Sequence, residues 1–122
     1  MVKLCNQLIV SATLLAIGES IELARACGVD PTAMPATLAG GFADSTLLQL
    51  FGPRMATSQT EPRTGAIRTM MKDVDAVATM ASASIDGIPL LASVQRIYRG
   101  LCTAGHADDD LVALGHLRCE FF

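Results

Sequence analysis

Charged residues are scarce in this sequence, and their scarcity narrows the range of partners. Asp, Glu, Lys and Arg make up 17% of the 122 residues, the formal net charge is −3, and the basic residues form no cluster. A nucleic-acid site needs concentrated positive charge to meet the phosphates, so we expect no nucleic-acid partner. Because 51% of the residues are hydrophobic, the charged groups cannot cover the surface, and part of the apolar surface is expected to face a protein partner.

The sequence also lacks the signals of membrane, secreted and metal-binding proteins. Glu19, Glu22 and Arg25 interrupt the N-terminal apolar stretch, and no clean signal-peptide cleavage site follows it. The four cysteines are far apart and lack CxxC spacing, which favours buried thiols over a disulfide frame. His106 and His116 have no partner at metal-ligand spacing. We therefore expect a cytoplasmic protein with no metal site and no membrane contact.

The pattern that is present throughout is helical. Apolar residues recur at helical spacing between glycine and proline breaks, and no segment alternates convincingly with a period of two. The sequence predicts an all-α fold for residues 1–122, a single compact bundle of about six helices around one long N-terminal helix. The expected helices are 3–27, 31–39, 45–51, 66–84, 89–104 and a last one after Asp108-Asp109-Asp110, with Gly52-Pro53 ending the third.

Three polar residues stand at the head of the first predicted helix. Lys3, Asn6 and Gln7 are spaced i, i+3 and i+4, so they share one face, and apolar residues beginning with Val10 continue that face. One interpretation is a solvated helix end. The other is a lysine at the mouth of a cleft, where it exchanges protons while the two amides orient its partner. The spacing alone does not choose between them.

A resemblance to a known family favours the second interpretation. Lys3-Leu4-Cys5-Asn6-Gln7 resembles the KxxN(N/Q) signature of the β-hydroxyacid dehydrogenases, which include 3-hydroxyisobutyrate dehydrogenase and tartronate semialdehyde reductase. Met71-Lys72-Asp73-Val74 resembles the KDL segment of the family, and residues 40–45 resemble a segment of the tartronate semialdehyde reductase branch. Pro89-Leu90, Tyr98, Gly105, Asp110 and Ala113 follow the closing pattern of the family. The ordered combination is similar to the C-terminal domain alone, whose fold is 6-phosphogluconate dehydrogenase C-terminal-like.

The resemblance implies a role for each residue of the two motifs. Lys3 matches the catalytic lysine, the general acid/base, and Asn6 matches the asparagine that binds substrate beside it. Gln7 is implied to support substrate binding. Lys72 matches the lysine that approaches the cofactor, NAD or NADP, and Asp73 borders the same cleft. Without the family pattern, Lys72 and Asp73 would be interpreted as an exposed pair on a solvated helix face.

Among the departures of the sequence from the family, two bear on cofactor binding. Gly65 stands where the family usually has an aromatic residue, eight positions before Asp73, and no GxGxxG occurs anywhere in the chain. We therefore expect the cofactor to be bound mainly by an N-terminal Rossmann domain absent from this chain, which would be inactive in isolation. The implied function is part of an NAD(P)-dependent oxidoreductase acting on a small β-hydroxyacid, such as 3-hydroxyisobutyrate or tartronate semialdehyde. The alternative is a helical oligomerisation module without catalytic chemistry, and under either interpretation a homodimer or higher homo-oligomer is expected.

Overall fold

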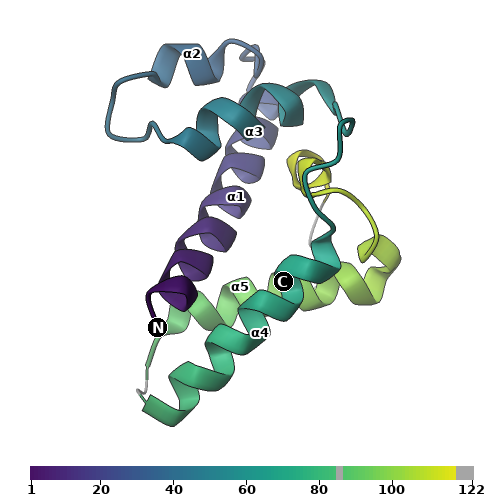
Figure 1. The fold of residues 1–122 in the computed structure, drawn as a ribbon. Coiled ribbons are helices and arrows are strands. Elements are labelled where there is room, and N and C mark those ends of the chain that lie inside the picture. The colour runs from purple at the N-terminus through teal and green to yellow at the C-terminus, as the bar shows by residue number, and fades with distance from the viewer. Residues whose placement is uncertain (85–86, 118–122) are drawn as a thin grey trace. The chain divides into compact units, whose positions relative to one another are not determined.

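The computed structural model describes residues 1–84 and 87–117, and its regular elements are helices (Figure 1). They are α1 Val2–Ala26, α2 Met34–Leu38, α3 Thr46–Thr57, α4 Ile67–Ser84, α5 Pro89–Leu101, the π-helical turn η1 Cys102–His106 and the 3-10 helix η2 Leu111–Gly115. The predicted all-α fold is confirmed. The contacts divide the described chain into two compact units, residues 1–12 with 65–109 and residues 13–64 with 110–117.

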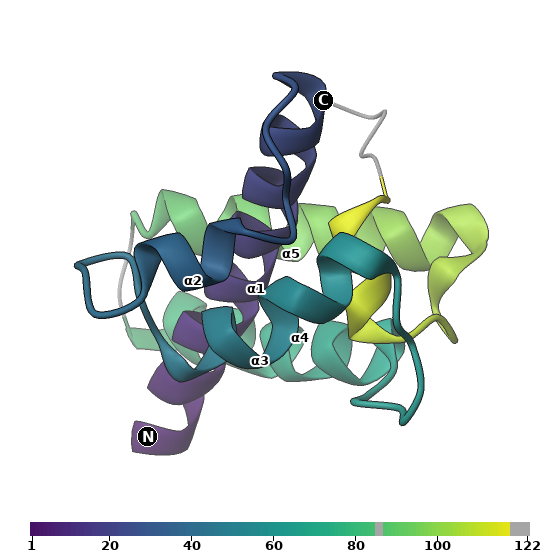
Figure 2. The same cartoon turned by 90° about the horizontal axis from the view of Figure 1, so that it is seen from above.

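The first unit is built on two helices, α4 and α5, that lie side by side (Figure 2). Each contributes a buried stripe at spacing i, i+3, i+7 and i+10, the repeat of one helix face. The stripes are Ile67, Met70, Val74 and Val77 on α4, and Leu91, Val94, Tyr98 and Leu101 on α5. Tyr98 is fully buried, and its hydroxyl donates a hydrogen bond of 2.9 Å to the backbone carbonyl of Ser11. Desolvation raises the pKa of Tyr98, so the phenol keeps the proton that fixes the first turns of α1 against α5.

The second unit depends on backbone segments that approach closely at two glycines. A Cβ atom on Gly18 of α1 would lie 2.4 Å from the carbonyl oxygen of Leu114. A Cβ atom on Gly115 would lie 2.7 Å from the Cβ of Met55 in α3. Only glycine therefore lets η2 pack against both helices. The apolar residues buried in this unit are Leu14, Ile17, Ile21, Pro35, Leu48, Met55, Leu111, Val112, Ala113 and Leu114.

Asp110 joins two segments of the second unit that are distant in sequence. Its carboxylate accepts hydrogen bonds from the backbone N–H and the hydroxyl of Thr64, both at 2.7 Å, and from the N–H of Val112 at 3.0 Å. The last bond caps η2 at its N-terminus. Asp110, one of the acidic residues predicted at the start of the last helix, is therefore its N-cap. The helix itself is a short 3-10 segment.

The predicted end of the third helix at Phe51 is wrong. Helix α3 continues to Thr57 with Pro53 inside it, although a proline removes one hydrogen bond from a helix interior. The residues beyond Pro53 contribute to the core, because Met55 is fully buried against Gly115. The left-handed conformation of Ser58 then closes the helix. Burial of this last turn offsets the lost bond.

The predicted short helix 31–39 is also shorter than expected. Asp30 does cap the segment, accepting hydrogen bonds from the N–H of Thr32 at 3.0 Å and from its hydroxyl at 2.7 Å. These bonds stabilise a turn at Pro31, and α2 begins only at Met34. Local capping residues therefore marked the start of the ordered segment and not the start of the helix.

The expectation of buried thiols is wrong for the described cysteines. Cys5 and Cys27 are exposed and Cys102 is half-buried, while Cys119 lies outside the described residues. For Cys5 the error arises because α1 is apolar nearly all round, so its pattern does not show which side is covered. By length and hydropathy alone α1 could also cross a membrane, a criterion that core helices of soluble proteins and signal sequences meet as well.

Candidate functional site

The first polar motif lies on the opening turns of α1. Lys3 and Asn6 are exposed, and Gln7 is half-buried. The helix places Leu4 and Leu8 on another side, where they line a pocket with residues of α4 and α5. That apolar contact orients α1 within the first unit and leaves Lys3 and Asn6 facing outward.

Gln7 joins the two motifs that the sequence singled out. Its side-chain nitrogen Nε2 donates a hydrogen bond of 2.7 Å to Oδ2 of Asp73 on α4. Its oxygen Oε1 accepts a bond of 3.0 Å from Nδ2 of Asn6. Residues 66 positions apart in the sequence thus form one hydrogen-bonded row, Asn6 to Gln7 to Asp73. The motifs that resemblance alone had associated lie together in space.

Each of the two lysines lies close in sequence to a member of this row, but in the part of the chain that the structure describes no hydrogen bond joins either lysine to it. Lys72 precedes Asp73 on α4 and is exposed, as is Lys3 on α1. In residues 1–84 and 87–117, neither lysine forms an ion pair. Both ammonium groups are therefore available to an anionic ligand.

A second polar cluster, which the sequence did not reveal, joins α4 to α5. Asp75 accepts hydrogen bonds from Gln95 at 3.0 Å and from the Nε of Arg99 at 2.9 Å. Desolvation tends to raise the pKa of Asp75, but the bonds from Arg99 and Gln95 together with the charge of Arg99 hold it below its ordinary value. The i, i+4 spacing of Gln95 and Arg99 was the available signal, but nothing in the sequence identified Asp75 as their partner.

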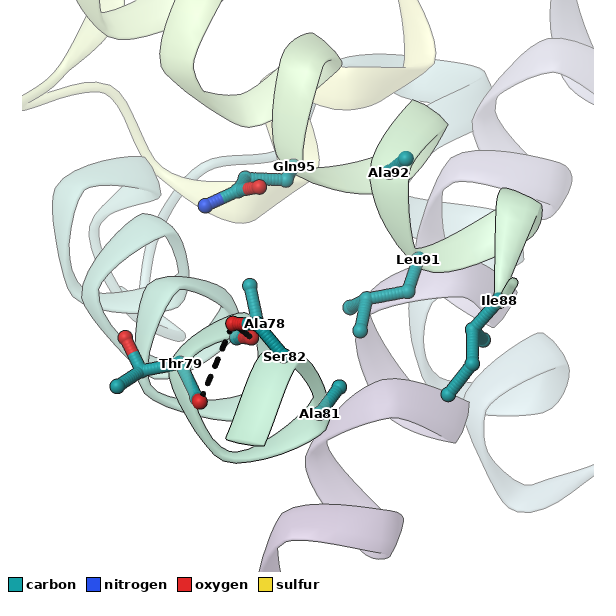
Figure 3. Close-up of a pocket in the computed structure, with 8 residues that line it drawn as sticks. All are labelled: Ala78, Thr79, Ala81, Ser82, Ile88, Leu91, Ala92 and Gln95. Atoms are coloured by element: carbon teal, nitrogen blue, oxygen red, sulfur yellow. Dashed lines mark hydrogen bonds between the residues drawn. The ribbon is translucent and has the colours of Figure 1, made fainter. Parts of the chain in front are cut away.

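Two pockets of the first unit are lined by residues other than Asn6, Gln7 and Asp73. One, of about 350 Å³, lies between α4 and α5 and is lined largely by small side chains together with Gln95 (Figure 3). Another, of about 210 Å³, is almost wholly apolar and is lined by residues that include Cys5, Val77 and Met80. The second lining includes Leu4 and Cys5 of the first motif, but neither lining includes a member of the polar row or either lysine. In the described part of the chain, no group of His, Cys, Asp and Glu side chains is arranged to hold a metal ion.

Comparisons with known proteins agree with the resemblance of the motifs. The chain is 30% identical over 112 residues to the 2-hydroxy-3-oxopropionate reductase of Escherichia coli, covering 92% of this chain and 38% of that protein. It is 28% identical over 109 residues to the L-threonate dehydrogenase of Cupriavidus necator, covering 89% of this chain and 36% of that protein. The chain thus spans well under half the length of these relatives.

Solved structures show the same fold. A 3-hydroxyisobutyrate dehydrogenase from Salmonella typhimurium superposes with a TM-score of 0.84 at 23% identity, over 93% of this chain and 39% of that one. The Mycobacterium tuberculosis 3-hydroxyisobutyrate dehydrogenase with L-serine gives 0.81 at 22% identity, over 94% and 41%. The family described as the NAD-binding domain of NADP-dependent 3-hydroxyisobutyrate dehydrogenase matches residues 1–117, and the chain belongs to this family.

Proposed function

We propose that this chain is the substrate-binding and proton-transferring part of an NAD(P)-dependent dehydrogenase that acts on a small β-hydroxyacid. The main support is the hydrogen bond between Gln7 and Asp73, which brings the two family motifs to one place. A helical module that served only to associate would have no need to join these polar side chains.

Lys3 is the proposed general acid/base. Its amine takes the proton from the substrate hydroxyl when the alcohol is oxidised and returns it when the carbonyl is reduced. Asn6, one helical turn further on, binds the same part of the substrate, and Gln7 holds Asn6 in place. The nicotinamide cofactor, when bound, accepts or supplies the hydride.

Lys72 and Asp73 on α4 are the residues of this chain proposed to contact the cofactor. Lys72 offers an exposed ammonium group, which suits a phosphate or carboxamide oxygen, and Asp73 lies beside it. The described residues offer no glycine-rich phosphate loop, so most of the dinucleotide contacts are assigned to an N-terminal Rossmann domain of the same enzyme. A cytoplasmic location is part of this proposal.

The proposal is tested with a chimera. The matching segment of the E. coli 2-hydroxy-3-oxopropionate reductase is replaced by this chain, and turnover is followed by nicotinamide absorbance with small hydroxyacids. Lys3→Ala should lower kcat by about 10²–10⁴-fold, because it removes the proton-transferring group but little of the core. Lys72→Ala is the matched control among exposed lysines and should mainly raise the KM for the cofactor.

Two outcomes would contradict the proposal. One is near-normal turnover of the Lys3→Ala chimera, and the other is steady turnover by the isolated 122-residue chain, which lacks the means to position a dinucleotide. Circular dichroism of each variant checks that a loss of turnover does not reflect loss of the helices.

A further inference from the structure

We infer that Asp73 acts through Gln7 to fix which atom of Asn6 is presented to the substrate. The inference rests on the proposed function only for the identity of the ligand. The row of hydrogen bonds itself is a property of the first unit. Asp73 is then a positioning residue that does not need to touch the substrate.

The direction of the row is set at its Asp73 end. An ionised carboxylate has no proton to donate, so it accepts hydrogen bonds only. The partner of Asp73 Oδ2 must therefore be the amide nitrogen of Gln7, at 2.7 Å. A free glutamine amide can rotate to exchange its oxygen and nitrogen, but here that rotation would place two acceptors against each other.

The same constraint passes to Asn6. Since Nε2 of Gln7 faces Asp73, Oε1 faces Asn6, and an oxygen there requires a donor. Nδ2 of Asn6 supplies it at 3.0 Å. Within the described residues, no hydrogen bond reaches Oδ1 of Asn6, so this carbonyl oxygen stays available.

An available carbonyl oxygen recognises a hydrogen-bond donor. The group it suits is a donor of the substrate other than the proton that Lys3 takes, such as a second hydroxyl, and Lys3 lies one turn away on the same face of α1. If Asn6 rotated, it would present its NH₂ group to the same hydroxyl oxygen instead. The charge of Asp73 therefore selects the orientation in which Asn6 accepts a hydrogen bond from the substrate.

Side-chain NMR of the 122-residue chain tests this row without any turnover. The readout is the order parameter of the Asn6 Nδ2 amide, measured by ¹⁵N relaxation, with the shifts of its two protons. Asp73→Asn keeps the size of the side chain but lets residue 73 donate or accept, so Gln7 loses its fixed orientation. The Asn6 order parameter should fall to the flexible range, below about 0.6, although Asn6 does not contact residue 73.

Gln7→Met and Lys72→Ala complete the experiment. Gln7→Met removes both bonds while keeping a side chain of similar length, and it should give the same loss of order at Asn6. Lys72→Ala changes the neighbour of Asp73 but no member of the row, so Asn6 should keep its wild-type shifts and order. The inference is overturned if Asn6 is equally ordered with and without Gln7, or if Lys72→Ala disturbs it as much as Asp73→Asn. Turnover of the Lys3 variants would be unaffected by either result, so this failure and that of the proposed function can be told apart.

Discussion

Asp110 is the residue whose contribution to the fold is most easily isolated. It is 2% exposed, and its carboxylate accepts three hydrogen bonds from Thr64 and Val112. Asp110→Ala would leave the buried N–H of Val112 and the partly buried N–H of Thr64 without this acceptor, and would remove the N-cap of η2. We expect a loss of about 2–4 kcal/mol in the free energy of unfolding, measured by urea denaturation.

Asp108→Ala serves as the control for Asp110. The side chain of Asp108 is 82% exposed and its ion pair with Arg68 is in solvent, so its removal should cost under about 1 kcal/mol. Equal losses for the two variants would mean that Asp110 is not a special acceptor.

For single residues, the sequence predicted the chemical role of a side chain better than its hydrogen-bond partner. The acidic run before the last helix was recognised as helix-start charge, but nothing in the sequence paired Asp110 with Thr64, which lies 46 positions earlier. Gln7 was likewise given a supporting role through resemblance. Its bond to Asp73 depends on how α1 packs on α4, which the spacing of residues within one helix does not contain.

At the scale of elements, Asp75 makes the pairing of α4 with α5 sensitive to acid. Its pKa is depressed by Arg99 and Gln95, despite desolvation, so its ionised form stabilises the folded state. This contribution is present above the ordinary aspartate pKa of about 3.9 and is lost as the pH falls through the lower folded value. We expect Asp75→Asn to lower the free energy of unfolding near neutral pH by less than about 1 kcal/mol, and to lower Tm accordingly. The variant should also show a smaller further fall in Tm below about pH 4 than the wild type.

Arg99→Gln provides the matching change on α5. It removes the charged partner while leaving the Asp75 carboxyl, so it should also reduce the acid-dependent fall in Tm. Thermal melts followed by circular dichroism at several pH values make the comparison. If both variants lost Tm in acid as steeply as the wild type, the Asp75 cluster would not contribute to acid sensitivity.

Helix positions followed from local pattern more reliably than helix ends. The expected segments 66–84 and 89–104 agree closely with α4 and α5, since each carries a regular apolar stripe between glycine and proline signals. The prediction that Gly52-Pro53 ends the third helix is wrong because burial of Met55, a tertiary contact, stabilises the helical turn after Pro53. The last segment folded as a 3-10 helix because its backbone approaches Gly18 and Met55 closely, which no local pattern records.

At the scale of the whole molecule, the apolar character of α1 exceeds what the first unit covers. Val2 is 83% exposed and Ile9 is 64% exposed, and Cys5 between them is exposed as well. These residues, at spacing i, i+3 and i+7, form one stripe, which we call the α1 outer stripe. A stripe of exposed apolar side chains such as this one is typical of a surface that binds another protein surface.

We therefore expect the chain to self-associate, with a twofold dimer as the default symmetry. Burial of the α1 outer stripe would contribute roughly 25 cal/mol per Å² of apolar area before the entropy of association is subtracted. Light scattering on a size-exclusion column should show a mass above that of the 12.8 kDa chain at micromolar concentration. Ile9→Lys should shift the mass to the monomer, because it places a charge in the stripe, whereas Ala76→Lys on the exposed side of α4 should not. A monomer at every concentration for the wild-type chain would contradict self-association, and would leave the stripe as a contact for the proposed N-terminal domain.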